Sequence, residues 1–271
     1  MNNRYLQRGL SMIELMVALA ISSFLIIGVT QIYIDNKRSY SFQQSQSENQ
    51  EGSRYALIFL QQELAKAGYR RRPDEPMENA FPAENLSGCN FTTGQTVMRI
   101  SATSVCIRYQ PRDSNDRDCQ GTAVGTAANF TSPYTKSTEN FIERIWFDSA
   151  NNNLVCTRQV SGGQPKDAVM MGGLADLRFI FGVGSAASPR NVTQYLASPT
   201  TTQPILAVRF VTLTRSTGNY VRDASSVDDA LLNWKNYSGA TAAEVTALKN
   251  ADKSQLYQFS QNTVTLRNLT P

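Results

Sequence analysis

The longest apolar run of the chain lies close to its N-terminus. Residues 15–29, LMVALAISSFLIIGV, contain no charged side chain, and the apolar character continues to Ile34. A segment of about 20 such residues is long enough for a helix to cross the ~30 Å hydrocarbon core of a bilayer. Arg4 and Arg8 precede the run without an acidic residue, so the positive-inside rule predicts a cytoplasmic N-terminus, with everything from Asp35 onward outside the inner membrane.

A second helical pattern follows directly. Residues 35–68 contain no proline and are rich in Gln, Ser, Glu and Arg. Apolar side chains recur within them at three- and four-residue spacing, which predicts an amphipathic helix that stops at Gly68. Gly52 weakens helix propensity, so a bend is compatible with the pattern. We interpret the arginines at 70–72 as cations that favour the negative end of this helix. The apolar stripe consists of Leu57, Leu60, Leu64 and Ala67.

Beyond about residue 86 the chain changes to short alternating runs separated by turn residues, which is typical of strands. Leu177, Phe179 and Phe181 share one face, so we expect an antiparallel sheet with one side packed on the amphipathic helix. Residues 228–234 and 241–250 predict short helices, and 184–204 predicts a long surface loop. The predicted strands are 97–100, 105–109, 141–147, 153–160, 176–183, 205–215 and 262–269.

Composition argues against most enzyme chemistry. The 271 residues include no histidine, which excludes Ser-His-Asp and Cys-His catalysis and histidine metal sites. The chain has no Walker-type GxxxxGK[ST] motif and no GxGxxG between a strand and a helix. A formal charge of +4, scattered along the chain, gives no argument for nucleic-acid binding. We therefore expect a protein that is not an enzyme and that has no cofactor and no metal.

Four cysteines follow the apolar run, in the region expected outside the membrane, where thiols oxidise. They contain no CxxC pair, and an even count permits two disulfides in three connectivities. Cys119 and Cys156 lie on either side of the predicted strand 141–147, so we hypothesise that they are bonded to each other. By elimination the second bond joins Cys89 and Cys106.

Glu14 lies just inside the apolar run, where an ionised carboxylate is costly to bury. The residues around it, Arg8-Gly9 followed by LSMIE, resemble the leader of type IV prepilins and pseudopilins. The resemblance implies cleavage after Gly9 by a membrane prepilin peptidase, N-methylation of Leu10, and Glu14 as the fifth mature residue. In this family the first mature residue is more often Phe or Met, whereas here it is Leu10. In a helix bundle, Glu14 of one subunit could pair with the N-terminal amine of its neighbour and fix their axial register.

The same resemblance implies an α+β, type IV pilin-like fold in which a long N-terminal helix packs on an antiparallel β-sheet head. The implied parts are a leader (1–9), a transmembrane and assembly half of the helix (10–34), an amphipathic half (35–68) and a β-rich periplasmic or extracellular head (69–271). The head is similar, in short strings, to minor pilins of the PilW group. These strings are DCQG (118–121), NLVC (153–156), LADLRFIFGVG (174–184), AVRFVTLTRS (207–216) and VTLRN (264–268).

For such a minor pilin, the resemblance implies a priming and tip complex that starts pilus growth, with roles in twitching motility and adhesion. The implied partners are other minor pilins, a major pilin, the prepilin peptidase, the inner-membrane assembly platform and a tip adhesin. The implied location is the inner membrane, then the pilus tip. Three alternatives stay open: a J-group pseudopilin of type II secretion, which shares the LRN ending, a signal-anchored periplasmic binding protein or enzyme, and a DNA-binding pilin.

Overall fold

The computed structural model describes residues 11–86, 88–123, 130, 132, 134–135, 140–159, 164–222 and 226–270. The leader expected at residues 1–9 lies outside this part of the chain. The same holds for the expected cleavage and methylation position at Gly9 and Leu10.

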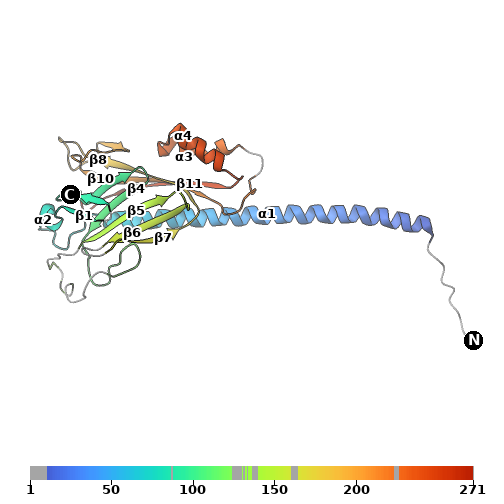
Figure 1. Cartoon of the computed structure of the whole chain (residues 1–271), viewed down its shortest axis with the longest axis horizontal. Helices are drawn as coiled ribbons and strands as arrows, with labels where there is room; N and C mark the ends of the chain where they lie inside the picture. Colours follow the sequence, from blue (N-terminus) through green and yellow to red (C-terminus); the bar gives the residue numbers. More distant parts are fainter. Residues whose placement is uncertain are drawn as a thin grey trace, which may run out of the picture.

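One long helix dominates the molecule. Helix α1, Met12–Lys66, contains 55 residues, which corresponds to roughly 80 Å at 1.5 Å per residue. Its N-terminal part protrudes from the head, whereas its C-terminal part lies against the sheets (Figure 1). The helix runs through Gly52 as one element, and Met171 covers this position, with its Cε 3.4 Å from where a Cβ would lie. The weak helix propensity of Gly52 therefore does not interrupt α1.

The buried side of α1 matches the predicted apolar stripe. Leu60, Leu64 and Ala67 are fully buried, and Leu57 is partly buried against the same core. These side chains pack on strands from both large sheets, including Ile107, Ile145, Val208 and Phe210. Burial of a Leu side chain contributes about 1.5–3 kcal/mol, so this stripe holds the helix to the head.

A four-stranded antiparallel sheet lies beside the helix. Its strands are β8 (Leu174–Val183), β9 (Gln194–Leu196), β10 (Ile205–Arg215) and β11 (Tyr257–Thr265). They are ordered β11-β10-β8-β9. Leu177, Phe179 and Phe181 are buried on the face that meets the α1 core, as predicted.

A five-stranded antiparallel sheet forms the other main layer, with its strands in chain order. A small hairpin and a single-turn helix lie at the end of the head away from the protruding part of α1 (Figure 1). The five-stranded sheet consists of β3 (Val97–Ser101), β4 (Ser104–Tyr109), β5 (Phe141–Asp148), β6 (Asn153–Gln159) and β7 (Lys166–Met171). The hairpin consists of β1, Glu84–Leu86, and β2, Cys89–Phe91, and the short helix is α2, Met77–Ala80.

The four-stranded sheet is also covered on the face that does not meet α1, which the sequence did not predict. Helices α3, Val227–Ser238, and α4, Ala242–Ala251, pack on its other face. Trp234 is fully buried there, and its indole N–H donates to the Asp176 carboxylate at 2.8 Å. Arg178 donates to the same carboxylate at 2.9 Å. The acidic and basic residues that alternate with the leucine and phenylalanines of β8 thus face a second core instead of solvent.

Most predicted strands are present, with two differences. Strand β11 starts at Tyr257 and ends at Thr265, so the LRN string (266–268) lies beyond it. Strand β9 lies inside the segment 184–204 that was expected to be a loop. The short strands β1, β2, β7 and β9 were not predicted. Three of them, β1, β2 and β9, have only three residues each, and β7 depends on pairing with its neighbour β6.

The LRN string instead closes the C-terminal end of α1. The Asn268 side-chain amide donates to the carbonyl oxygens of Ala65 and Ala67, at 3.2 and 3.0 Å. Gly68 has a φ of +74°, and a Cβ added there would lie 2.5 Å from the Leu269 side chain. Both the backbone conformation and the close approach require glycine at this position.

Asn268→Ala should destabilise the head by about 1–2 kcal/mol, since it removes the hydrogen bonds to two helix-end carbonyls. Chemical denaturation of the full chain in detergent micelles, monitored by Trp fluorescence, measures the change. Arg267→Ala, at the exposed neighbouring position, is the control and should change the free energy of unfolding by less than about 0.5 kcal/mol. Equal denaturation midpoints for both variants would contradict the capping role.

Candidate functional site

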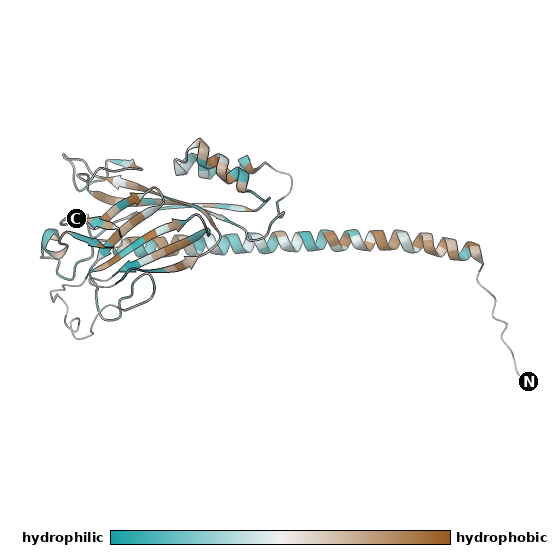
Figure 2. Cartoon of the chain, in the orientation of Figure 1, coloured by the Kyte–Doolittle hydropathy of each residue, from teal (hydrophilic) through white to brown (hydrophobic). Residues whose placement is uncertain are grey.

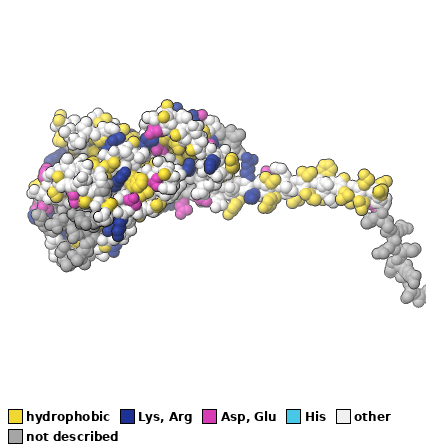
Figure 3. All heavy atoms as spheres, in the orientation of Figure 1, with side chains coloured by type: hydrophobic (Ala, Val, Ile, Leu, Met, Phe, Trp, Pro, Cys, Tyr) yellow, Lys and Arg dark blue, Asp and Glu magenta, His cyan; other side chains and the backbone are white. Residues whose placement is uncertain are grey.

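The protruding part of α1 presents apolar side chains with no partner in the described chain. Met12, Ile13, Phe24 and Ile27 are between 66% and 84% exposed, and the other large apolar residues up to Ile34 are also exposed. Figure 2 shows the continuous hydrophobic colour of this segment, and Figure 3 shows its apolar side chains around the visible surface of the helix. Among the described residues, α1 is the one helix that is long and apolar enough to cross a membrane. Such a surface requires lipid or other apolar helices around it.

Glu14 stands at the start of this apolar surface. Its carboxylate accepts a hydrogen bond from the backbone N–H of Ser11 at 3.1 Å, so it caps its own helix. The side chain is exposed, and the carboxylate is directed toward the N-terminal end of the chain. The position next to Ser11 is Leu10, the residue at which the resemblance implies a new N-terminus. Glu14 thus lies within one helical turn of that position.

The head begins to hold the helix at about Ser45. The Asn49 side chain donates to the carbonyl oxygen of Leu256 at 2.8 Å, and the Thr217 hydroxyl donates to Glu48 at 2.8 Å. Before this point every described residue of α1 is exposed. The free part of the helix therefore includes the described residues of the expected transmembrane segment and the mostly polar residues 35–44 after it.

Both disulfides are present with the connectivity expected from the sequence. Cys89–Cys106 joins the small hairpin to β4, and Cys119–Cys156 joins the segment before β5 to β6. The Cα atoms are 6.0 and 6.4 Å apart, respectively. The bonds tie long connections to the five-stranded sheet, which is a structural role.

A buried carboxylate lies next to the second disulfide. One oxygen of Glu143 accepts from the Tyr109 hydroxyl at 2.7 Å and from the Cys119 backbone N–H at 2.9 Å. The other oxygen has no hydrogen-bond partner in the described part of the chain. Burial, and then the nearby Glu63 carboxylate, raise the pKa of Glu143 to about 8. Lys66, which pairs with Glu63 at 2.7 Å, opposes this shift.

Cys119, Cys156 and Glu143 also form the one cluster of potential metal ligands found among the described residues. Both sulfur atoms are already joined in the disulfide, so neither is a thiolate that could bind a metal ion. The arrangement fits a structural contact between a carboxylate and a loop better than it fits a metal centre.

Two buried arginines organise the loops at the end of the head away from the free part of α1. Arg108 is fully buried, lies over the rings of Phe81 and Phe91, and donates to four backbone carbonyls. Burial lowers its pKa to about 10, so it keeps its charge at neutral pH. The four carbonyls belong to Phe81, Pro82, Thr92 and Gln95. This role of Arg108 was not predicted, because the residue lies inside an ordinary strand pattern.

The interpretation of the arginines at 70–72 as cations at the helix end is wrong for Arg71. Its side chain is buried and donates to the carbonyls of Pro111, Arg112, Ser132 and Thr135. Arg72 pairs with Asp74 at 2.5 Å, and Arg70 donates to the Glu75 carbonyl. The side chain that binds the helix-end carbonyls is Asn268.

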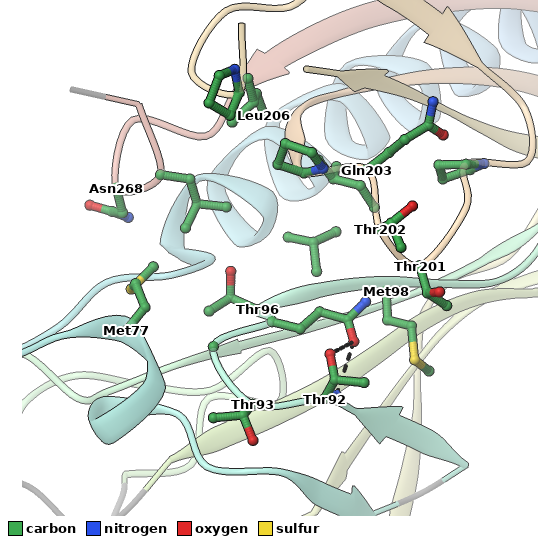
Figure 4. A pocket seen from close by; sticks show the side chains of 18 of the residues that line it. Met77, Thr92, Thr93, Thr96, Met98, Thr201, Thr202, Gln203, Leu206 and Asn268 are labelled. Carbon is green, nitrogen blue, oxygen red and sulfur yellow. Dashed lines mark hydrogen bonds between the residues drawn. The ribbon is translucent and has the colours of Figure 1, made fainter. Parts of the chain in front are cut away.

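A groove of about 920 Å³ opens at the same end of the head (Figure 4). Strand β3 and the preceding turn, residues 92–99, form one wall, and residues 199–206 form the other. Thr92 and Thr96 from one wall and Thr201 and Thr202 from the other lie around the space, with Asn268 at its side. The lining thus combines polar side chains with apolar ones such as Met77, Met98 and Leu206.

Comparison with known proteins places the candidate site at the N-terminus. Residues 4–30 match the model of the prokaryotic N-terminal methylation motif. No protein with curated function matches the chain. Among solved structures, a type IV-like pilin from Thermus thermophilus is similar, with a TM-score of 0.44 and 14% sequence identity over 82% of this chain and 96% of that one. The motif match includes Gly9, Leu10, Glu14 and most of the exposed apolar surface.

Glu143→Gln should remove a loss of stability that the native protein shows as the pH rises. The pKa of Glu143 is higher in the folded state than in the unfolded state, so the folded protein binds the additional proton. Stability should therefore fall between about pH 4.5 and 8, with a slope of at most about 1.4 kcal/mol per pH unit. Denaturation at several pH values measures this slope. The exposed control Glu51→Gln should keep the native slope, and the same slope in Glu143→Gln would contradict the prediction.

Replacing both cysteines of one disulfide with serine should destabilise the head by an amount that increases with the length of the loop that the bond closes. The sequence separations are 37 residues for Cys119–Cys156 and 17 for Cys89–Cys106. Loop-closure entropy then predicts losses of about 4 and about 3 kcal/mol, respectively. Denaturation midpoints of the two double variants measure the difference. A variant without Cys119 and Cys156 that is as stable as the native protein would rule out this structural role.

Proposed function

We propose that this chain is a minor pilin of a type IV pilus, made as a precursor and cut after Gly9 by a prepilin peptidase that methylates Leu10. The observation that carries the proposal is the coincidence of two features in one segment. Residues 4–30 match the N-terminal methylation motif, and every described residue of the helix that starts within this motif is exposed up to position 44, so its apolar side chains are uncovered on all sides. A buried core helix or a solvated linker would not present such a surface.

The free part of α1 then serves in two apolar environments in succession. In the inner membrane the apolar segment is surrounded by lipid, with the N-terminus in the cytoplasm and the head in the periplasm. In the fibre the same side chains pack on the helices of neighbouring pilins. The polar part of α1 that precedes Ser45 keeps the head away from the membrane surface while the helix is anchored.

Glu14 fixes the register of this packing. Cleavage after Gly9 creates an α-amino group at Leu10, within one turn of the Glu14 carboxylate. In a helix bundle the carboxylate of one subunit pairs with the amine of its neighbour, and each charge compensates the desolvation of the other. Because an unpaired buried charge is costly, subunits that are shifted along the axis are disfavoured.

A priming complex of minor pilins supplies the first helix neighbours. Moving one apolar helix from lipid into an empty fibre axis is unfavourable, whereas moving it against other apolar helices preserves its contacts. We therefore place this chain, similar to the PilW group, in a membrane cluster that initiates the pilus and then occupies its tip. Its partners are other minor pilins, the major pilin and the inner-membrane assembly platform, with a tip adhesin as a further partner. Twitching motility and adhesion are the functions that depend on it.

The N-terminus of the protein purified from its native membrane tests the proposal directly. Intact mass and N-terminal sequencing should show a chain that begins with methylated Leu10 in cells with an active prepilin peptidase. A chain that still begins at Met1 in these cells would refute the processing step and favour a signal-anchored domain.

Glu14→Ala tests the assembly role separately from processing. The variant should be cleaved and folded normally but should be absent from sheared surface pili, because the register contact is lost. Glu51→Ala removes an exposed carboxylate from the same helix outside the apolar segment and should be incorporated normally. Normal incorporation of Glu14→Ala would contradict the pairing with a neighbouring amine.

A pseudopilin of type II secretion is the second candidate, because the LRN ending that closes the C-terminal end of α1 is shared with the J group. The two systems share the leader and the helix, so only the phenotype separates them. Loss of surface pili in a deletion strain supports the pilus assignment. Loss of secreted hydrolases with normal pili supports the secretion system.

A further inference from the structure

Strand β3 forms one wall of the groove with a free edge. Among the described strands, β3 is paired with β4 alone. The backbone N–H of Arg108 in β4 donates to the carbonyl of Thr96 at 2.9 Å. Bonded residues alternate along an antiparallel ladder, so Val97 and Arg99 direct their N–H and C=O groups to the opposite edge. Both residues line the groove, which thus contains an unpaired strand edge.

The space beside this edge suits an extended chain. A volume of about 920 Å³ lies within the range of pockets that enclose sizeable ligands, and an added strand needs about 4.8 Å between backbones. Thr96 is 2% exposed, and its hydroxyl has no hydrogen-bond partner among the residues that the structure describes. This residue lies at the base of the groove (Figure 4). A polar group without a partner is costly to bury, so a ligand that reaches it gains free energy.

The charges around the groove indicate which side chains a ligand should carry. Among the described residues that line it, three are basic (Arg70, Arg99 and Arg190) and one, Glu78, is acidic. Arg99 donates to the carbonyl of Ala197 at 2.8 Å, and none of the three arginines forms an ion pair with a described residue. The groove is therefore complementary to an acidic side chain.

The walls are held in place before any ligand binds. Arg108 fixes the turn that leads into β3 through the carbonyls of Thr92 and Gln95. The bond from Arg99 to Ala197 ties β3 to the segment that leads to the opposite wall. A rigid groove of this kind avoids most of the entropy cost of ordering a site on binding.

We propose that this groove binds an extended segment of a partner polypeptide that adds a strand to the free edge of β3 and places an acidic side chain against Arg190 and Arg70. The groove adjoins α2, at the end of the head opposite the free part of α1 (Figure 1). A bound segment therefore leaves the apolar surface of the helix unobstructed. This binding activity goes beyond the proposed function and does not require processing at Gly9.

Selection from a display library of random nine-residue peptides tests the proposal on the full chain in detergent micelles. Selected peptides should carry an Asp or Glu within an otherwise alternating sequence without proline. N-methylation of alternate backbone nitrogens in a selected peptide should abolish binding, because strand addition depends on main-chain hydrogen bonds. Replacing its acidic residue with the corresponding amide should weaken binding.

Arg190→Glu should weaken binding of the selected peptides by about tenfold or more, through repulsion of the acidic side chain. The matched charge reversal Arg54→Glu, at an exposed position on α1 far along the chain from the groove, should leave the affinity unchanged. A selection that yields no binding peptide would overturn the proposal. Peptides that tolerate both N-methylation and Arg190→Glu would overturn it as well.

Discussion

The packing of the C-terminal part of α1 against two sheets is the contact on which the rest of the structure depends. The fully buried Leu60 and Leu64 lie in one core with Ile107 of the five-stranded sheet and Phe210 of the four-stranded sheet. The helix is therefore the common partner of both layers. The same helix continues beyond the head with its apolar side chains exposed. One continuous helix therefore connects the folded domain to the lipid or apolar helices around the free segment.

The end of the head away from that segment is built on a different principle. The loops there are held by arginines that donate to several carbonyls, together with the Cys89–Cys106 bond. Arg71 and Arg108 each replace, with one side chain, the backbone hydrogen bonds that a longer strand would have made. Irregular backbone can then surround a groove without leaving its carbonyl groups unpaired.

The sequence predicted the features that depend on local pattern. The structure contains the elements whose hydrophobic pattern could be recognised in the sequence. These are the apolar run, the stripe through Leu60 and Leu64, most long strands and the two helices after residue 226. The sequence did not predict features that depend on partners distant in the chain. In the sequence Arg71 has the pattern of a surface cation, and its burial depends on the distant carbonyls of Pro111 and Ser132 that accept its hydrogen bonds. Strand β8 has two buried faces only because α3 and α4 cover the second one. The groove is likewise invisible in the sequence, since its two walls come from segments about 100 residues apart.

The closure of the C-terminal segment on the end of α1 has a mechanical consequence. Strands β10 and β11 run lengthwise beside the helix (Figure 1), and the segment after β11 returns to cap the helix end through Asn268. Tension applied along α1 is therefore passed to β11 in shear, so many inter-strand hydrogen bonds resist together instead of opening one after another. The Leu269 side chain against Gly68 blocks the helix end sterically. The head should thus withstand pulling along its longest axis better than pulling across it.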